Sequence, residues 1–139
     1  MNEISKLVQR YNVVWNESDV DHRRRVIAEL WSEDATHYTE TLEVHGHEEI
    51  ETRIIGTYEK YVGTGEYVFK ALDNAVSHHN VVRLKWIMLP QNGGKAAASG
   101  TVFVILGSDG RILSDYQFSD FTRKCQRFLF VHVRNQLWT

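Results

Sequence analysis

The N-terminal part of the chain carries apolar residues at the spacing of an amphipathic helix. From Ile4 to Trp15 they recur at steps of three and four residues, which predicts a helix with one buried face. That face consists of Ile4, Leu7, Val8, Tyr11, Val14 and Trp15. The polar segment NESD ends this pattern. Ser18 and Asp21 have the spacing of a capping box, so a second helix is expected to begin there.

Two further helices are predicted, with one strand between them. The second helix is expected to leave the polar run His22–Arg25 in solvent and to bury one apolar stripe. That stripe is Val20, Ile27, Leu30 and Trp31. A polar strand from Ala35 to Leu42 follows. The turn HGHEEI then places Glu48 and Glu49 in the first turn of a third helix, where the helix dipole favours acidic side chains. The inner face of that helix is Ile50, Ile54, Tyr58 and Tyr61.

The second half of the chain changes to the period-two pattern of β-strands. Four strand-length runs follow one another: YVFKALDNAVS, NVVRLKWIML, KAAASGTVFVIL and RILSDYQFSDF. Asn92–Gly94 and Ser108–Gly110 have the composition of hairpin turns. The second run has one apolar face, formed by Val82, Leu84, Trp86 and Met88, and one mixed face, so helices are expected on one side of the sheet only. The predicted class is α+β, with three N-terminal helices packed on a curved, mainly antiparallel sheet of four or five strands.

The C-terminal segment does not fit this scheme as well. We expect residues 1–139 to form a single domain, with residues 1–121 as its core and residues 122–139 as an extension. From Arg127 to Arg134 the extension alternates like a strand but carries apolar residues on both faces, so both faces need cover. Either a partner subunit or the protein's own domain would provide it.

Composition narrows the class of protein. A chain of 139 residues with 42% hydrophobic residues suits one globular core. A net charge of −2 gives no reason to expect nucleic acid as a partner. The single cysteine, Cys125, excludes an internal disulfide and fits a reducing compartment. The N-terminus lacks the pattern of a secretion signal, and no apolar stretch is long enough for a bilayer, so we expect a cytoplasmic protein without a membrane partner.

The predicted elements resemble a known superfamily. The segments VQRYNVVWNESDVDHRRRVIAELWSEDATHY and VHGHEEI, followed by the strands and GSDGRILSDYQFSDF, resemble the SnoaL-like, nuclear transport factor 2-like superfamily over residues 4–121. Its members include ketosteroid isomerases, limonene epoxide hydrolase and polyketide cyclases, and it hosts both enzymes and non-enzymatic binders. The resemblance implies a cone-shaped α+β barrel with a deep, mostly apolar pocket between helices and sheet. It also implies a homodimer through the outer face of the sheet.

The catalytic patterns of this superfamily are only partly present. The oxyanion tyrosine of the ketosteroid isomerases matches Tyr11. Their general base falls on Thr39, or on Glu40 if one residue bulges, and their second aspartate falls on Val102. The charged pair of limonene epoxide hydrolase has no counterpart in SGTVFVIL. A polyketide-cyclase-like pattern keeps one acid or base, Asp115, so the resemblance favours that reading over steroid isomerisation.

Three side chains are candidates for catalysis. In the register that the resemblance implies, His37 and Thr39 point inward from the first strand, and Asp115 and Gln117 point inward from the last. A buried carboxylate such as Asp115 could move a proton near neutral pH. Tyr11 could donate to an oxygen that gains charge, and His37 could act as a base or a hydrogen-bond donor. Each has a structural alternative: Asp115 as a solvated edge residue, Tyr11 as a core tyrosine and His37 as an ordinary structural histidine.

The predicted ligand-binding residues are those that would line the pocket. Most are aromatic, because core aromatic residues also line pockets of this kind. They are Trp15, Trp31, Thr39, Glu40, Tyr58, Phe69, Trp86, Thr101, Phe103 and Gln117. His45, His47 and Glu48 have part of the composition of a metal site, but three such residues before a helix are expected to be capping groups. Neither a metal nor a cofactor is therefore predicted.

Three hypotheses about function remain open from the sequence. The protein is a metal-free isomerase, cyclase or hydrolase that moves a proton on a small apolar or carbonyl-bearing molecule. Alternatively, the same pocket binds a hydrophobic ligand without turnover. In the third hypothesis, the sheet face and the tail assemble a dimer or bind another chain. The first requires an interior carboxylate within hydrogen-bonding distance of a second polar group, and the third an interior filled by aromatic rings.

Overall fold

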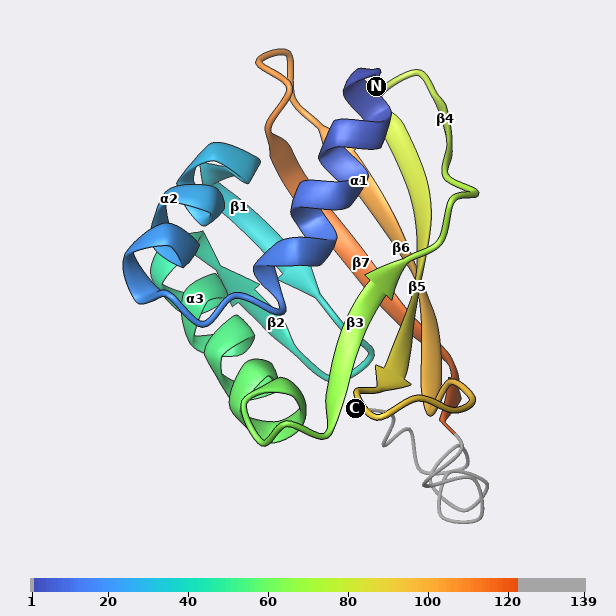
Figure 1. Ribbon diagram of the computed structural model, residues 1–139. Coiled ribbons are helices and arrows are strands. Elements are labelled where there is room, and N and C mark those ends of the chain that lie inside the picture. The colour runs from blue at the N-terminus through green and yellow to red at the C-terminus, as the bar shows by residue number, and fades with distance from the viewer. Residues whose placement is uncertain (1, 123–139) are drawn as a thin grey trace.

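The computed structural model describes residues 2–122, in which helices pack against one face of a curved sheet (Figure 1). This α+β arrangement confirms the predicted fold class, and within residues 2–122 helices cover one side of the sheet, as predicted. The predicted extra strand and Cys125 lie outside the described residues. None of the helices within residues 2–122 is long and apolar enough to cross a membrane.

The three α-helices lie in the first half of the chain, as their apolar spacing predicts. A short π-helix continues the third of them. Their bounds are Glu3–Val14 (α1), Val20–Leu30 (α2), Gly46–Thr57 (α3) and Tyr58–Val62 (η1).

Seven strands form one sheet, in the order β2-β1-β7-β6-β5-β3, with β4 also paired to β5. Their bounds are Trp31–Tyr38 (β1), Glu43–His45 (β2), Tyr67–Ala71 (β3), Val76–His78 (β4), Val81–Pro90 (β5), Ala98–Leu106 (β6) and Ile112–Thr122 (β7). All pairs are antiparallel except β1 and β7, which run parallel. The sheet is therefore mainly antiparallel, as predicted. The pattern missed β2, whose three residues are too few to show a period of two. The run YVFKALDNAVS, predicted as one strand, is divided in the structure between β3 and β4.

The first strand begins and ends four residues earlier than predicted. Trp31, expected on the second helix, is the first residue of β1 and is fully buried. Beyond Tyr38 the chain turns toward β2, because the Thr39 N–H donates to the carbonyl oxygen of Leu42 at 2.9 Å. The Thr39 hydroxyl accepts from the Leu42 N–H at 3.0 Å and closes the same turn. The predicted strand 35–42 therefore joined the end of β1 to the turn at residues 39–42, because the side chains of that turn continue the pattern of a strand.

Helix α1 is attached to the edge strand β3 by two asparagines. The side-chain amides of Asn12 and Asn16 donate to the Phe69 carbonyl oxygen at 3.0 and 2.7 Å, and the Phe69 N–H donates to Asn16 at 2.8 Å. These bonds satisfy backbone groups that a sheet edge would otherwise leave open. They also orient the helix so that Tyr11 points into the interior, where it is buried as predicted.

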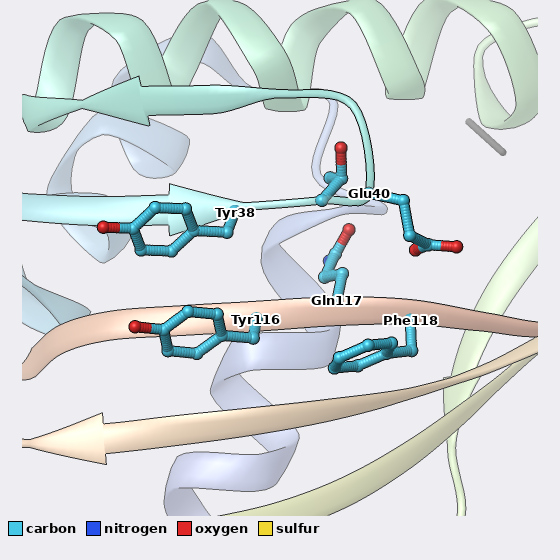
Figure 2. Close-up of a pocket in the computed structure, with 6 residues that line it drawn as sticks. Tyr38, Glu40, Tyr116, Gln117 and Phe118 are labelled. Atoms are coloured by element: carbon cyan, nitrogen blue, oxygen red, sulfur yellow. The ribbon is translucent and has the colours of Figure 1, made fainter. Parts of the chain in front are cut away.

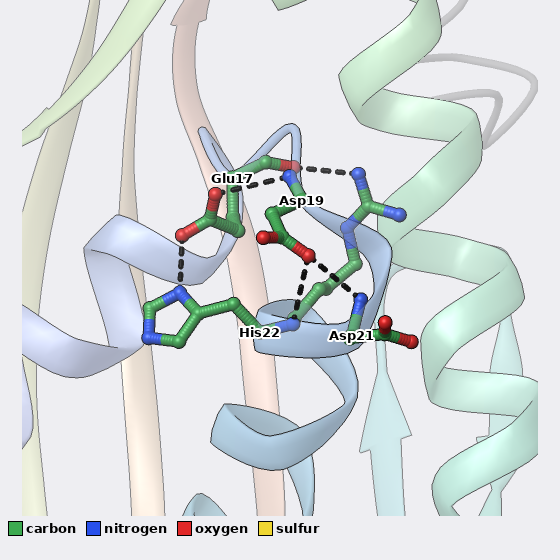
Figure 3. Close-up of polar contacts among 5 residues, drawn as sticks. Glu17, Asp19, Asp21 and His22 are labelled. Carbon is green, nitrogen blue, oxygen red and sulfur yellow. Dashed lines mark hydrogen bonds and ion pairs between the residues drawn. The ribbon is translucent and has the colours of Figure 1, made fainter.

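Helix α2 is capped by a different residue from the one predicted. Asp19 is the N-cap, and its carboxylate accepts from the backbone N–H groups of Asp21 and His22 at 2.9 and 3.1 Å (Figure 3). The capping box predicted at Ser18 is therefore wrong by one residue. Aspartate and serine have similar N-cap preferences, so spacing alone could not separate two adjacent candidates.

The polar run at the start of α2 is not fully solvated either. Arg23 is buried, and its guanidinium donates to the backbone oxygen of Glu17 and lies 5.3 Å from the ring of Tyr58. Glu17 also pairs with the ring of His22 (Figure 3). Arg23 thus connects α2 to the π-helix η1, and Tyr58, a predicted ligand-binding residue, has a packing role there.

Helix α3 follows the predicted pattern. Gly46, at its first position, has φ +79°, a backbone conformation that glycine adopts without strain. Glu48 and Glu49 occupy the first turn, and Ile50 and Ile54 are buried against the sheet. The helix lies across β1, which places its inner side over the end of the sheet that carries the polar interior residues described below (Figure 1).

The strands divide their side chains between two faces. The inner face carries the predicted apolar stripe of β5, in which Val82, Leu84 and Met88 are buried. We call the opposite, helix-free side the outer face. Its aromatic residues are Tyr38, Phe103, Tyr116 and Phe118.

Candidate active site

A buried carboxylate lies where the one parallel pair of strands brings β1 and β7 together. His37 of β1 is directly opposite Asp115 of β7 in the register of that pair. Both side chains have 0% exposure. Asp115 Oδ2 accepts from the Tyr11 hydroxyl at 2.7 Å and from His37 Nδ1 at 2.8 Å, and Oδ1 accepts from Trp31 Nε1 at 2.9 Å. These four residues are called the Asp115 centre below.

The hydrogen bonds of the Asp115 centre select one tautomer of the neutral His37 ring. Because His37 Nδ1 faces a carboxylate oxygen, it carries the hydrogen, and in the neutral ring Nε2 then holds a free lone pair. His37 Nε2 is buried and has no hydrogen-bond partner among residues 2–122. The geometry is that of a base held by a carboxylate, with its proton-accepting atom unoccupied.

The Tyr11 hydroxyl group makes two hydrogen bonds. It donates to Asp115 and accepts from the Gln117 amide Nε2 at 3.0 Å. Burial, followed by the negative charge of Asp115, raises the pKa of Tyr11 well above its ordinary value. Tyr11 therefore stays protonated, and its hydroxyl hydrogen is donated to Asp115.

The network continues from Gln117 to a cation on α3. Arg53 donates to the Gln117 Oε1 at 3.2 Å and to the Thr57 hydroxyl at 3.0 Å. Its guanidinium lies 5.6 Å from the ring of Trp15, which in turn lies 5.7 Å from the ring of His37. Burial lowers the pKa of Arg53, although an arginine remains charged at any physiological pH.

Two hollows have a residue of this network in their lining. A groove of about 340 Å³ is lined in part by Arg53. Its lining is Leu42, Val44, Glu48, Glu49, Thr52 and Arg53. A smaller hollow of about 60 Å³ includes Gln117 (Figure 2). Its other lining residues are Tyr38, Thr39, Glu40, Tyr116 and Phe118.

The structure brings the three predicted catalytic residues, Asp115, Tyr11 and His37, into direct contact. Of the predicted ligand-binding residues, Trp31 belongs to the Asp115 centre, and Trp15 and Gln117 contact its members. The rings of Tyr11, Trp15 and Trp31 pack around the carboxylate and the imidazole. The deep pocket that the resemblance implies is therefore not open to solvent at this point.

Other predicted residues lie farther from the Asp115 centre. Phe69 and Trp86 pack edge to face at 5.6 Å beside a second apolar cluster. Thr39 closes the β1–β2 turn, and the exposed Glu40 lies beside it, where its carboxylate accepts from the Ser119 N–H at 3.4 Å. Although Glu40 is exposed as a residue, partial removal of its carboxylate from water raises its pKa from the ordinary value.

Two predicted pocket residues point away from the interior. Thr101 and Phe103 lie on the outer face, because their neighbours Val102 and Val104 take the inward positions of β6. The Thr101 hydroxyl donates to Asp120 at 2.8 Å, and Phe103 is 37% exposed. The prediction took both as ligand-binding residues, and Phe103 as a core residue, without counting the alternation from the buried valines.

Arg53 is the main residue that sequence reasoning missed. It lies one residue before Ile54 and three after Ile50, so it interrupts the apolar stripe of α3 with a charge. Such a cation on the inner stripe of a helix was the available signal.

The candidate metal ligands before α3 have other partners. His45 bonds to Thr36 at 2.9 Å and to Glu43 at 3.0 Å, and His47 donates through Nε2 to the Trp31 carbonyl oxygen at 2.8 Å. Within residues 2–122, no group of three or more histidine, cysteine, aspartate or glutamate side chains is placed to hold a metal ion.

Comparison with known proteins identifies the fold. No protein-family model matches the sequence, and neither does any curated protein. A proposed isomerase of the SnoaL-like family from Agrobacterium tumefaciens is 27% identical, with a TM-score of 0.78 over 87% of this chain and 100% of that one. A proposed polyketide cyclase from Sinorhizobium meliloti is 17% identical, with a TM-score of 0.62 over 81% and 93% of the two chains.

A third solved structure extends this comparison. A hypothetical protein with a ketosteroid isomerase-like fold from Catenulispora acidiphila, in complex with trimethylamine, is 12% identical, with a TM-score of 0.60 over 81% of this chain and 83% of that one. The last two structures show the fold alone. The chain thus has the SnoaL-like, nuclear transport factor 2-like fold, which confirms the resemblance read from its sequence.

Proposed function

We propose that the protein is an enzyme that moves a proton on a small carbonyl-bearing molecule, as an isomerase or a cyclase does. The observation that carries this proposal is His37, fully buried, bonded through Nδ1 to Asp115 and unpaired at Nε2. Enzymes place a base in this way when it must accept a proton away from water. The activity proposed for the SnoaL-like protein from Agrobacterium tumefaciens belongs to the same class of reaction.

In the proposed reaction, His37 Nε2 takes a proton from the carbon next to the substrate carbonyl. The electron pair of that C–H bond moves toward the carbonyl oxygen and gives an enolate. In an isomerase the proton returns from His37 to another carbon. In a cyclase the enolate carbon attacks a second carbonyl carbon, the electron pair of that C=O bond moves to its oxygen, and this oxygen takes the proton back from His37. Asp115 stabilises the imidazolium that forms, as a buried carboxylate does beside a histidine base.

The sequence predicted that Tyr11 donates to the oxygen that gains charge. We propose that Trp15 takes this role and that Tyr11 does not. The proton of Tyr11 is used by Asp115, so we assign Tyr11 as a positioning residue. Trp15 Nε1 is buried without a partner among the described residues, next to the ring of His37. Its N–H is the candidate donor to the enolate oxygen.

A binding role without turnover is the second candidate function. Asp115 and His37 are completely buried, so a substrate reaches them only if the interior opens. Without such an opening, a ligand would bind at the surface hollows and no reaction would take place. The predicted homodimer belongs to either function and is supported by the exposed aromatic rings of the outer face, which offer a second copy an apolar surface. A cytoplasmic location remains a prediction from the sequence.

Hydrogen exchange tests the proposed chemistry without knowledge of the natural substrate. A panel of ketones and keto acids is incubated with the protein in D₂O, and the loss of hydrogen beside the carbonyl is followed by NMR. We expect exchange with the wild-type protein and a loss of at least about 100-fold in His37→Gln, since positioned bases contribute about 10²–10⁴. His78→Gln, an exposed histidine on β4, is the matched control. Exchange that persists in His37→Gln would exclude His37 as the base, and ligand binding without exchange would favour the second function.

A further inference from the structure

The interior around the Asp115 centre has more hydrogen-bond donors than acceptors. Four buried N–H groups have no partner among residues 2–122: Trp15 Nε1, Arg23 Nε, Arg53 Nε and Trp86 Nε1. Two of them belong to side chains next to this centre, because the ring of Trp15 lies 5.7 Å from that of His37 and Arg53 donates to Gln117. An indole or guanidinium nitrogen can only donate. Buried donors without acceptors are costly, so native proteins rarely keep several of them together without a reason.

The donors of Trp15 and Arg53 come from two elements that pack against each other. The Arg53 guanidinium of α3 lies 5.6 Å from the ring of Trp15, the residue that follows α1.

Arg53 also brings a positive charge that no carboxylate neutralises directly. In the described part of the chain it makes no ion pair, and its hydrogen bonds go to the neutral groups of Gln117 and Thr57. By contrast, the exposed Arg24 pairs with Glu51 at 2.7 Å. An unpaired cation that is largely removed from water destabilises a fold, and so a functional reason for it is expected.

Arg53 lines the groove of about 340 Å³, together with the apolar side chains of Leu42 and Val44. Glu48 and Glu49 line it too, but both are exposed, so water and salt screen their charges. The field of the partly buried Arg53 is screened less, so a negative group is favoured next to its guanidinium.

We propose that the natural ligand carries a carboxylate, that Arg53 binds this carboxylate, and that the adjoining part of the ligand lies over Trp15 toward His37. A carboxylate matches the fork of a guanidinium, and its single charge matches the single cation among the described lining residues. A phosphate dianion would leave one charge without a partner. The inference deepens the proposed function by naming the substrate class, and it rests on that function only for His37 as the reacting base.

Paired ligands test the proposal by binding alone. Carboxylates with two to ten carbons, straight-chain and aromatic, are each compared with the amide of the same carbon skeleton by calorimetry. We expect at least one carboxylate to bind about tenfold or more tightly than its amide. If no carboxylate in the panel is preferred to its amide, the proposal is overturned.

Two variants locate the preference. Arg53→Gln removes the charge and keeps a polar side chain of similar reach, and we expect the preference to fall to about one. Arg25→Gln, on the exposed surface of α2, is the matched control and should keep it. A preference that survives in Arg53→Gln would overturn the proposal. If this variant does not fold, the ¹⁵Nε resonance of Arg53 in the wild-type protein replaces it: it should shift with the carboxylate and not with the amide, and an unmoved resonance would count against the proposal.

The failure of this proposal and that of the proposed function are distinguishable. His37→Gln should lose hydrogen exchange but keep the carboxylate preference. A carboxylate that binds through Arg53 without any exchange in the wild-type protein would refute proton transfer by His37 and support carboxylate binding by Arg53. Exchange of neutral ketones with no preference for carboxylates would support the proton transfer and refute the carboxylate binding.

Discussion

The two faces of strands β1 and β7 differ in a way that reverses the usual pattern of a sheet. On the inner face, His37 and Asp115 are polar and have 0% exposure. On the outer face, the next residues along each strand, Tyr38 and Tyr116, are aromatic and stack at 4.6 Å in nearly parallel planes. Most sheets bury their apolar side chains and expose their polar ones.

This difference shows that burial of apolar side chains alone does not decide which residues of β1 and β7 face inward. A slip of one residue would exchange the two faces and put the tyrosines inside. The observed register instead satisfies Asp115 with three donors and leaves four aromatic rings on the outer face. Buried polar groups and exposed apolar patches are the two features that most often mark functional surfaces, and these strands carry one on each side.

Replacement of Asp115 should produce the largest effect on stability. Asp115→Asn leaves one acceptor oxygen and adds a donor among the Tyr11 hydroxyl, the Trp31 indole and the His37 ring, so at least one of these donors faces the new NH₂ group, and the other two lose a charged acceptor. We expect the free energy of unfolding to fall by about 3 kcal/mol or more. Chemical denaturation measures it.

The control for this prediction lies on the same strand. Asp120→Asn changes an exposed carboxylate that faces Lys85 at 3.7 Å, and we expect a loss of about 1 kcal/mol or less. If Asp115→Asn and Asp120→Asn cost the same, the inner face is not distinguished by its polar network, and the contrast between the two faces would lose its physical basis.

Tyr11 should give a smaller effect that depends on pH. Burial and the charge of Asp115 raise the pKa of Tyr11. Above about pH 10 the unfolded chain releases this proton while the folded chain keeps it, so wild-type stability is complete below that pH and falls as the pH rises toward the folded pKa, by at most about 1.4 kcal/mol per pH unit.

The variant Tyr11→Phe removes this dependence. It should be less stable than the wild type by about 1–2 kcal/mol at pH 8, because Asp115 loses a donor. The difference should narrow above pH 10. Tyr116→Phe leaves Tyr11 in place and should keep the alkaline decline. Parallel stability curves for wild type and Tyr11→Phe from pH 8 to 11 would show that Tyr11 does not hold its proton in the folded state.

Much of the fold follows from the sequence because periodicity determines it. The helical spacing from Ile4 to Trp15 and the alternation from Val82 to Met88 each specify one buried face, and both are confirmed. The ends of elements were less predictable. Asp19 and Ser18 are both good N-caps, and the choice depends on contacts beyond the local sequence.

The candidate site was predictable as residue types but not as a network. His37 and Asp115 were both expected to point inward, yet their contact depends on the parallel pairing of β1 with β7, which joins residues 78 positions apart. Arg53 was visible as a charge within the apolar stripe of α3, but its contact with Gln117 joins residues far apart in the sequence and could not be predicted from that stripe. Long-range pairing, rather than local pattern, decides which inward residues meet.

The outer face should show the smallest effect on stability, although it should change assembly. Phe118 is 48% exposed and lies 5.9 Å from the ring of Phe103. In a homodimer that buries these rings, Phe118→Ser should shift the protein from dimer to monomer in sedimentation, while the stability of the monomer changes by about 0.5 kcal/mol. Val13→Ser, at a position 49% exposed on α1, is the matched control and should leave the dimer intact. A wild-type protein that sediments as a monomer, or a dimer that survives Phe118→Ser, would mean that the aromatic rings serve another purpose and that only the inner face of these strands carries function.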